Sequence, residues 1–592
     1  MHEPLSFYTH KLTDLSAELI RLKSKLRWFG WYRFLAFVGI VLAPAFLGFT
    51  AWAGGLSFAF LVLLLFFVKV NIKLEQRKKK LAVLKQLVED ELAALDHSFL
   101  HFAGGEEFQD VEHFYSYDLD LFGQGSVFQF LNRTTTLGGK QKLANWLKHP
   151  PTSEAEIKRR QDAVAEMSDS IDWRLDFASE GKLFDETKQM SRELQDWSEM
   201  DLALKNPKLI RVLIALVPGL TLAAIIPYLF GITFFWLALM IFVQWVLLYF
   251  FWKRIAYYYR FFGRKSALLA KYMRLLSRIE NGEFQSAHLS KLQTEIKNPS
   301  AGMAFHQLKK RVKEFEYRQN LIVGFVLNTV FLWDLRCVYK LWKWHNQYHA
   351  KLRIWLDVVA EMDALISLGN YACNHPSYVF PEVATSDFVY RASNLGHPLL
   401  NPKKMVCNDL EISGYSKVMV VTGANMAGKS TFLRTVGVNL LLAEIGAPVC
   451  ATNMAFTPIS IYTNMRTTDS LLKDESYFFA ELKRIKTVLD HLQNGERYFV
   501  ILDEMLKGTN SVDKLNGSKA LIRKLVQLDA VALIATHDLK LSEMQAEYPT
   551  HIYNKCFEIS IENNELVFDY KLSEGVTQTM NATFLMKKMG II

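Results

Sequence analysis

The chain has 592 residues, a formal net charge of +9 and a hydrophobic fraction of 50%. This length accommodates three or four domains, and so high a hydrophobic fraction beside 22% charged residues indicates apolar blocks set between polar domains. Five scattered cysteines without a C-x-x-C pair exclude a disulfide framework and a cysteine-based zinc site, and they suit a reducing cytoplasm.

The first apolar block covers residues 34–68, which contain no Asp, Glu, Lys or Arg. As a helix it would extend about 50 Å, too long for one crossing of a ~30 Å hydrocarbon core and adequate for two short ones. We therefore expect a transmembrane hairpin over about 31–70 that turns near Thr50 to Gly55. A signal peptide is the competing interpretation, but the block starts too late and continues too long.

Residues 1–30 and 72–100 show apolar positions at three- and four-residue spacing. This pattern predicts helices that extend from the hairpin into the cytoplasm. Residues 1–105 are thus expected to form an N-terminal helical domain that includes the hairpin.

A second uncharged block covers residues 212–252 and is interrupted near Pro227 to Gly231. We expect it to form a second transmembrane hairpin, assigned to residues 208–252. A buried soluble core could explain one such block, whereas two blocks with Trp and Tyr at their ends favour insertion into a membrane.

Basic residues flank both blocks and are missing from the turns between their halves. By the positive-inside rule, all soluble parts and both termini lie in the cytoplasm of a multi-pass protein of the inner (cytoplasmic) membrane. Much of the net charge then meets anionic lipid headgroups, so it is poor evidence for DNA binding by itself. The flanking basic residues are Arg21, Lys23, Lys25, Arg27, Arg77, Lys78, Lys79, Lys80, Lys205, Lys208, Arg211, Lys253, Arg254, Arg260, Arg264 and Lys265.

Two further stretches, 106–207 and 253–385, are mostly helical by pattern, with a break expected at Pro299 to Gly302. Residues 321–333 are apolar but too few to span a bilayer, so we expect a buried or interfacial helix there. The aromatic and basic residues of 339–348 could form a stacking surface for single-stranded nucleic acid, but helix packing near the membrane interface is the favoured interpretation.

A glycine-rich turn follows a β-branched run in the segment Val418 to Leu433, which reads V-M-V-V-T-G-A-N-M-A-G-K-S-T-F-L. The spacing Gly423-x-x-x-x-Gly428-Lys429-Ser430, between a strand and a helix, predicts a phosphate-binding loop (P-loop) rather than a glycine turn before a buried helix. Lys429 would reach the β- and γ-phosphates, and the Ser430 hydroxyl would bind Mg²⁺. The expected ATP-binding residues of the loop are Gly423, Ala424, Asn425, Met426, Ala427, Gly428, Lys429, Ser430 and Thr431.

Two acidic residues end the next apolar run, Tyr498 to Glu504, which is typical of a buried strand. Asp503 is expected to complete the Mg²⁺ site, and Glu504 to orient or deprotonate the attacking water. A third strand, Ala530 to Thr536, ends at His537, which could sense the γ-phosphate. An ordinary core strand capped by solvated acids, and a structural histidine, are the alternative interpretations.

These motifs together resemble the MutS family of mismatch-repair ATPases. The P-loop Thr422–Thr431, the acidic segment Leu502–Ser511, the histidine segment Ala535–Asp538 and the signature segment Asp474–Glu481 each have a counterpart in that family. The resemblance implies ATP and Mg²⁺ as cofactors, a homodimer formed through the ATPase domains, and DNA as a partner. It also implies that Ser476 contacts, in trans, the nucleotide held by the opposing subunit, a role compatible with that of a helix N-cap.

Segments outside the ATPase resemble the family's helical core, or lever, domain. The block begins at Tyr117–Ser126 and continues through Phe130–Thr136 and Ile157–Val164, and Met362–Leu368 resembles its return. No N-terminal mismatch-reading domain, Phe-x-Glu wedge or nuclease-like tail is found, so the resemblance leaves mismatch specificity open. The Leu-Ser-Gly-Gly-Gln signature of ABC transporters is also missing.

We therefore expect a multidomain membrane protein with four transmembrane helices in two hairpins, an α-helical lever region and a C-terminal P-loop α/β ATPase domain at residues 386–592. The expected function is that of a membrane-anchored, DNA-dependent ATPase of the mismatch-repair family. A membrane or signalling ATPase that does not bind DNA is the alternative. A transporter is disfavoured, because the four spans hold no acidic or basic residue that would mark a substrate path.

Overall fold

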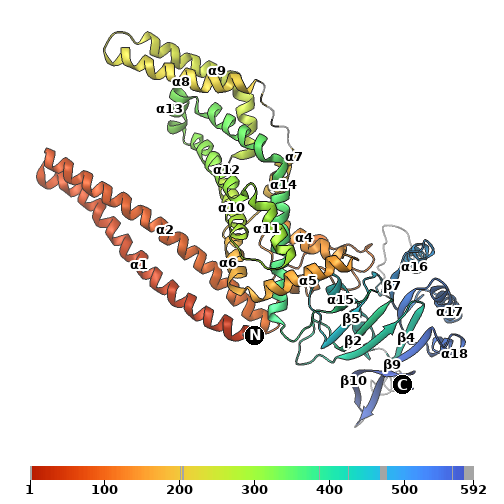
Figure 1. Ribbon diagram of the computed structural model, residues 1–592. Coiled ribbons are helices and arrows are strands. Elements are labelled where there is room, and N and C mark those ends of the chain that lie inside the picture. Colours follow the sequence, from red (N-terminus) through yellow and green to blue (C-terminus); the bar gives the residue numbers. More distant parts are fainter. Residues whose placement is uncertain are drawn as a thin grey trace.

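The computed structural model describes residues 3–199, 202, 204, 206–263, 265–385, 387–424, 426–466, 477–562 and 565–578. Figure 1 shows two long helical hairpins, a helical region between them, and an α/β domain at the far end from the hairpin tips. Among the described residues, four helices are long and apolar enough to cross a membrane. All four belong to the two hairpins.

The first hairpin consists of α1 (Pro4–Leu47) and α2 (Ala51–Leu95), which confirms that the helices extend well beyond the apolar block. The chain turns at residues 48–50, where the Thr50 side chain accepts a hydrogen bond from the Ala53 amide. The predicted position of the turn was therefore slightly late, because Gly54 and Gly55 lie inside α2. The ends of α1 and α2 remote from the turn pack against α6 of the helical region.

The second hairpin consists of α8 (Pro207–Leu229) and α9 (Phe235–Phe262). Its turn at residues 230–234 overlaps the predicted interruption but begins later, because Pro227 lies inside α8. Most of the large apolar side chains near both hairpin tips are exposed. The tips point to the same side of the molecule, away from the α/β domain (Figure 1).

The helical region is organised around α14 (Trp333–Asn374), a helix of about 63 Å that runs from the second hairpin toward the α/β domain. The break predicted at Pro299 is confirmed, since one helix ends at Lys297 and the next begins at Ala301. The other helices of the region are α3 (Val127–Leu131), α4 (Leu137–Lys148), α5 (Glu154–Asp169), α6 (Ile171–Lys182), α7 (Lys188–Glu199), α10 (Ser266–Glu280), α11 (Ala287–Lys297) and α12 (Ala301–Glu316).

The aromatic stretch at residues 339–348 packs inside the helical region, as the favoured interpretation predicts. Trp344, His345 and Tyr348 are buried, and the Trp344 indole donates a hydrogen bond of 2.9 Å to the Ala304 carbonyl oxygen. Because these rings contact other helices, they do not offer a stacking surface for nucleic acid.

Helix α13 (Leu321–Phe331) differs from the expectation of a buried helix. It leaves most of its apolar side chains exposed and rests against α8 and α9 on one face. The prediction of a helix buried within the protein is therefore wrong, and the exposed face fits the other prediction, an interfacial helix.

The α/β domain holds two sheets. A six-stranded sheet has the order β10-β9-β4-β8-β7-β6, with β10 antiparallel and the other strands parallel. A four-stranded sheet has the order β1-β5-β2-β3. The strands are β1 (Glu382–Val383), β2 (Val389–Leu395), β3 (Asn408–Ser413), β4 (Lys417–Gly423), β5 (Asn453–Phe456), β6 (Ser460–Asn464), β7 (Tyr498–Asp503), β8 (Val531–Thr536), β9 (Ile552–Glu562) and β10 (Glu565–Glu574). The helices are α15 (Lys429–Glu444), α16 (Tyr477–Gln493), α17 (Ser511–Gln527) and α18 (Met544–Glu547).

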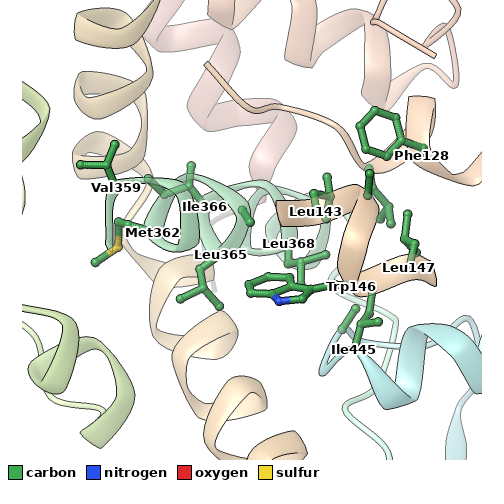
Figure 2. Packing of buried hydrophobic residues seen from close by; sticks show 14 of the residues in the cluster. Phe128, Leu143, Trp146, Leu147, Val359, Met362, Leu365, Ile366, Leu368 and Ile445 are labelled. Carbon is green, nitrogen blue, oxygen red and sulfur yellow. The ribbon is translucent and has the colours of Figure 1, made fainter. Parts of the chain in front are cut away.

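One hydrophobic core continues from the helical region into the α/β domain. Figure 2 shows Trp146 of α4 close to Leu368 of α14 and to Ile445, which follows α15. The guanidinium of Arg160 stacks over the Trp146 ring at 4.1 Å. The end of the long helix and the helix that follows the glycine-rich loop thus belong to one packed unit.

Candidate functional site: a P-loop opposite two carboxylates

The glycine-rich loop lies between β4 and α15, as the sequence predicts. Gly428 caps the helix with a φ of 102°, and Gly423 has a φ of 154°, which other residues rarely adopt. A side chain at Gly423 would also meet the Phe557 carbonyl oxygen at 3.0 Å. The first amides of α15 have no partner within the helix, so they are available to an anion at this end.

Lys429 begins α15 and is buried, with its ammonium group folded back onto the loop. Its Nζ donates hydrogen bonds of 2.6 and 2.8 Å to the carbonyl oxygens of Gly423 and Ala424. Burial lowers the pKa of Lys429, an effect that the negative charges of Glu504 and Asp503 oppose. A phosphate group would offer this cation stronger acceptors than two neutral carbonyls.

The two acidic residues reach the same sheet edge because β8 lies between β4 and β7. Thr422 of β4 is in register with Thr536, and Asp503 of β7 with Ala535. All three strands are parallel, so their carboxyl ends lie together, where ligands of open α/β sheets bind. The structure thus brings Asp503 and Glu504 to the P-loop.

Glu504 follows β7 with a φ of 56°, and its amide donates to the Ala535 carbonyl oxygen at 2.9 Å. Its carboxylate lies 3.1 Å from Nδ1 of His537. Burial alone would raise the pKa of Glu504, but the hydrogen bond and charge of His537, with Lys507 and Lys514, lower it below its ordinary value. Glu504 is therefore held as a carboxylate.

A cavity of about 510 Å³ lies between the P-loop and the acidic residues. Its wall includes Met426, Lys429, Ser430 and Thr431 of the loop and helix, together with Asp503 and Glu504. No cluster of three or more His, Cys, Asp or Glu side chains in the described residues could hold a metal on its own. Mg²⁺ commonly takes one or two protein oxygens and completes its shell with phosphates and water, so Ser430 and Asp503 fit that ion.

Several cavity residues were not among the predicted site residues. Most come from distant strands and loops, although Lys507 lies within the acidic segment Leu502–Ser511; the pairing of β9 with β4, and of β10 with β9, brings the last two to the loop. These residues are Leu395, His397, Leu400, Lys404, Val406, Asn408, Lys507, Phe557 and Tyr570.

Glu481 of α16 ends the predicted signature segment and contacts the loop that follows the acidic residues. Its carboxylate accepts hydrogen bonds from the amides of Leu506 at 2.6 Å and Lys507 at 3.1 Å. This contact fixes the loop that follows Glu504. Of the predicted site residues, Asn425 and Ser476 lie outside the described residues.

Comparison with known proteins agrees with this geometry. Residues 419–587 match the family model of MutS domain V, and residues 113–216 match that of MutS domain III. The chain is 28% identical over 317 residues to MutS protein homolog 4 of Mus musculus and of Homo sapiens, covering 52% of this chain and 30% of each relative. It is 30% identical over 253 residues to the DNA mismatch repair protein MutS of Thermotoga sp. (strain RQ2), covering 42% of this chain and 31% of that protein.

The chain thus spans about a third of the length of these curated relatives. The match to domain V includes the glycine-rich loop, both acidic residues and His537, and the match to domain III includes α4 and α5, which pack against α14. The two regions occur in one chain and share one core, so the chain combines segments similar to domains III and V of the MutS family.

Proposed function

We propose that the α/β domain binds Mg²⁺-ATP and hydrolyses its γ-phosphate. The observation that carries this proposal is the meeting of Lys429, Ser430, Asp503 and Glu504 around one cavity at the carboxyl ends of three parallel strands. The amides of α15 and Lys429 would hold the phosphates, and Ser430 and Asp503 would hold Mg²⁺, which neutralises charge on the phosphates. Glu504 would orient the attacking water and accept its proton, while His537 keeps Glu504 ionised.

We propose further that the chain assembles into a homodimer through its ATPase domains, which the similarity to the MutS family supports. In this proposal Ser476 reaches the nucleotide of the opposite subunit, so each site is shared. The test mixes two inactive variants, Ser476→Arg and Lys429→Ala. Shared sites restore one working site in the mixed dimer, whereas independent sites leave the mixture inactive.

The second part of the proposal is that the chain is anchored in the cytoplasmic membrane by its two hairpins. It is supported by four apolar helices whose exposed side chains would otherwise face water, and by basic residues at the ends remote from the hairpin tips. Both termini and the α/β domain then lie in the cytoplasm. Retention of the protein in membrane pellets after carbonate extraction would support anchoring, and release into the supernatant would refute it.

The third part concerns DNA, which the names of the relatives suggest. We propose that this protein couples ATP hydrolysis to binding DNA at the membrane surface. The test measures the ATPase rate of nanodisc-held protein with homoduplex, mismatched and branched DNA across a salt series. Stimulation by one DNA structure that persists at high salt supports DNA processing, because simple phosphate contacts are lost there.

A second candidate function is a membrane or signalling ATPase that does not use DNA. The observation that favours it is the second hairpin, which interrupts the helical region between α7 and α10. In the same experiment, an ATPase rate unaffected by any DNA but changed by lipid composition would support this function over the first.

A further inference from the structure

Helix α13 presents an apolar surface that no described part of the protein covers. Residues 319–333 contain no charged side chain, and Leu321 and Ile322 are 86% and 77% exposed. The helix has 11 residues, a length of about 16 Å, so it cannot cross a bilayer. A contiguous apolar surface of this kind marks contact with a partner or a membrane.

The opposite face of α13 is attached to the second hairpin through Gln244 of α9, which is fully buried. The Gln244 side chain donates to Thr221 Oγ1 of α8 at 2.6 Å and to the Val330 carbonyl oxygen at 3.3 Å. It also accepts a hydrogen bond of 3.1 Å from the Leu332 amide. One side chain therefore joins both helices of the hairpin to the end of α13.

The chain bends by 81° between α13 and α14. Leu332 makes the bend with a φ of 48°, a conformation that costs free energy for a residue with a side chain. Gln244 takes up the amide of Leu332, and Asn328 Oδ1 accepts the amide of Asp334 at 2.9 Å. Since the amides of Leu332 and Asp334 are satisfied inside the protein, two polar groups of the break are shielded from a lipid environment.

The depth of α13 follows from its contacts along α9. Gln244 precedes Lys253, the first basic residue after the uncharged block, by about 14 Å of helix. At the other end of α13, the Arg318 guanidinium lies 5.8 Å from the Trp252 ring and 4.7 Å from the Tyr259 ring. The start of α13 therefore lies beside the charged end of the hairpin, and its far end lies deeper along the apolar segment.

Arg318 has the surroundings of a residue at the headgroup level. Its Nη2 lies 3.4 Å from Asp334 Oδ2, and its Nη1 is buried without a hydrogen-bond partner among the described residues. The aromatic rings beside it are of the kind that concentrates at membrane–water interfaces. Between Arg318 and Phe325, a cavity of about 370 Å³ is walled by the aromatic rings of Trp245, Tyr249 and Trp252.

We propose that α13 is a re-entrant helix that dips into the cytoplasmic leaflet beside the second hairpin and returns through the bend at Leu332. Lipid acyl chains cover Leu321, Ile322 and Phe325 and fill the cavity against α9, and Arg318 lies at the level of the headgroups. The proposal rests on anchoring by the hairpins. It adds a fifth membrane contact, at the start of the long helix that leads to the ATPase domain.

The test places nitroxide spin labels on single cysteines in nanodisc-held protein and compares label collision with oxygen, which concentrates in lipid, and with a water-soluble nickel chelate. The background replaces Cys373 and Cys407, the cysteines that are not fully buried, by serine. Three sites with similar exposure are labelled: Ile322→Cys in α13, Phe242→Cys in α9 at 66% exposure, and Met303→Cys in α12 at 67%.

The expected result is an oxygen-accessible label at Ile322→Cys that is shallower than the one at Phe242→Cys, with Met303→Cys in water. A water-exposed label at Ile322→Cys beside a lipid-exposed one at Phe242→Cys would overturn the re-entrant helix and leave anchoring intact. Water exposure at both would refute anchoring itself. A label at Ile322→Cys that neither reagent reaches would show that protein, such as a second copy of the chain, covers this face, which also overturns the proposal.

Discussion

The Nδ1 atom of His537 lies 3.1 Å from Oε1 of Glu504. This contact joins the carboxyl ends of the neighbouring strands β8 and β7, at the sheet edge where the glycine-rich loop follows β4. The contact opposes burial, which alone would raise the pKa of Glu504. In the proposed function, His537 is therefore a positioning residue that acts through the Glu504 carboxylate, which lines the cavity.

The first prediction is that His537→Ala moves the acid limb of the ATPase pH profile to higher pH. Removing the imidazole removes the main interaction that lowers the pKa of Glu504, while burial continues to raise it. In the native protein, Glu504 stays ionised below the ordinary pKa of glutamate and is protonated only as the pH falls through its lowered pKa. In His537→Ala this protonation should occur at a higher pH. His491→Ala is the matched control, because His491 makes a similar contact of 2.8 Å with Glu496, on the surface. An unshifted acid limb in His537→Ala would contradict the positioning role.

The second prediction is that Glu504→Gln binds ATP but does not turn it over. The amide keeps the size of the side chain but cannot accept a proton from water, and general-base removal typically costs 10²–10⁴-fold in rate. The phosphate-binding groups remain, so the ATP-bound form should accumulate. Rapid-quench measurement of turnover and equilibrium binding of a fluorescent ATP analogue separate the two effects. Near-normal turnover would assign the proton acceptor to another residue.

The third prediction is that Lys429→Ala weakens ATP binding by about 100-fold or more, in line with the loss of a charged donor from a preorganised site. Lys429 is the only lysine or arginine that both lies in the described part of the P-loop and lines the cavity. Lys417→Ala provides the control. Lys417 begins β4, the strand that leads into the glycine-rich loop, and its side chain donates a hydrogen bond to the Thr550 carbonyl oxygen, away from the cavity. Equal ATP affinity in the two variants would refute the P-loop assignment.

The sequence predicted those parts of the site that are local in the chain. A strand, a glycine turn and a helix within 28 residues (417–444) specify the loop, and the apolar run before Asp503 specifies the strand that carries the acids. The contact of Glu481 with the loop after Glu504 and the place of Tyr570 beside Gly428 could not be predicted. They depend on how α16 and β10 pack against distant segments, which no periodic pattern encodes.

For the hairpins, too, the sequence predicts the features that depend on neighbouring residues but not those that depend on packing between distant segments. The uncharged blocks predicted their existence, since hydropathy is a local property. The sequence left α13 (Leu321–Phe331) as either a buried or an interfacial helix, because an apolar helix of 11 residues looks the same in sequence whether protein or another medium covers it. Only the burial of Gly324 and Asn328 in the structure shows which face of the helix is covered.

The fourth prediction concerns Asp118, a fully buried carboxylate that joins the helical region to the edge of the α/β sheet. It accepts hydrogen bonds from Thr463 Oγ1 at 2.7 Å and from the Arg466 amide at 2.9 Å, and Arg484 lies 3.6 Å away. Asp118→Ala leaves these donors buried without an acceptor, which should cost about 3 kcal/mol of stability. Asp110→Ala is the control, since Asp110 is half-exposed and its nearest lysine lies 3.7 Å away.

Differential scanning fluorimetry and limited proteolysis would measure the effect of Asp118→Ala. Because Asp118 contacts strand β6 and its neighbours rather than the P-loop, the variant should lower the melting temperature while ATP affinity below that temperature stays near normal. Early proteolytic release of the α/β domain would show that the buried carboxylate holds the two regions together. A melting temperature equal to that of Asp110→Ala would mean that the shared hydrophobic core around Trp146 and Ile445 is sufficient to do so.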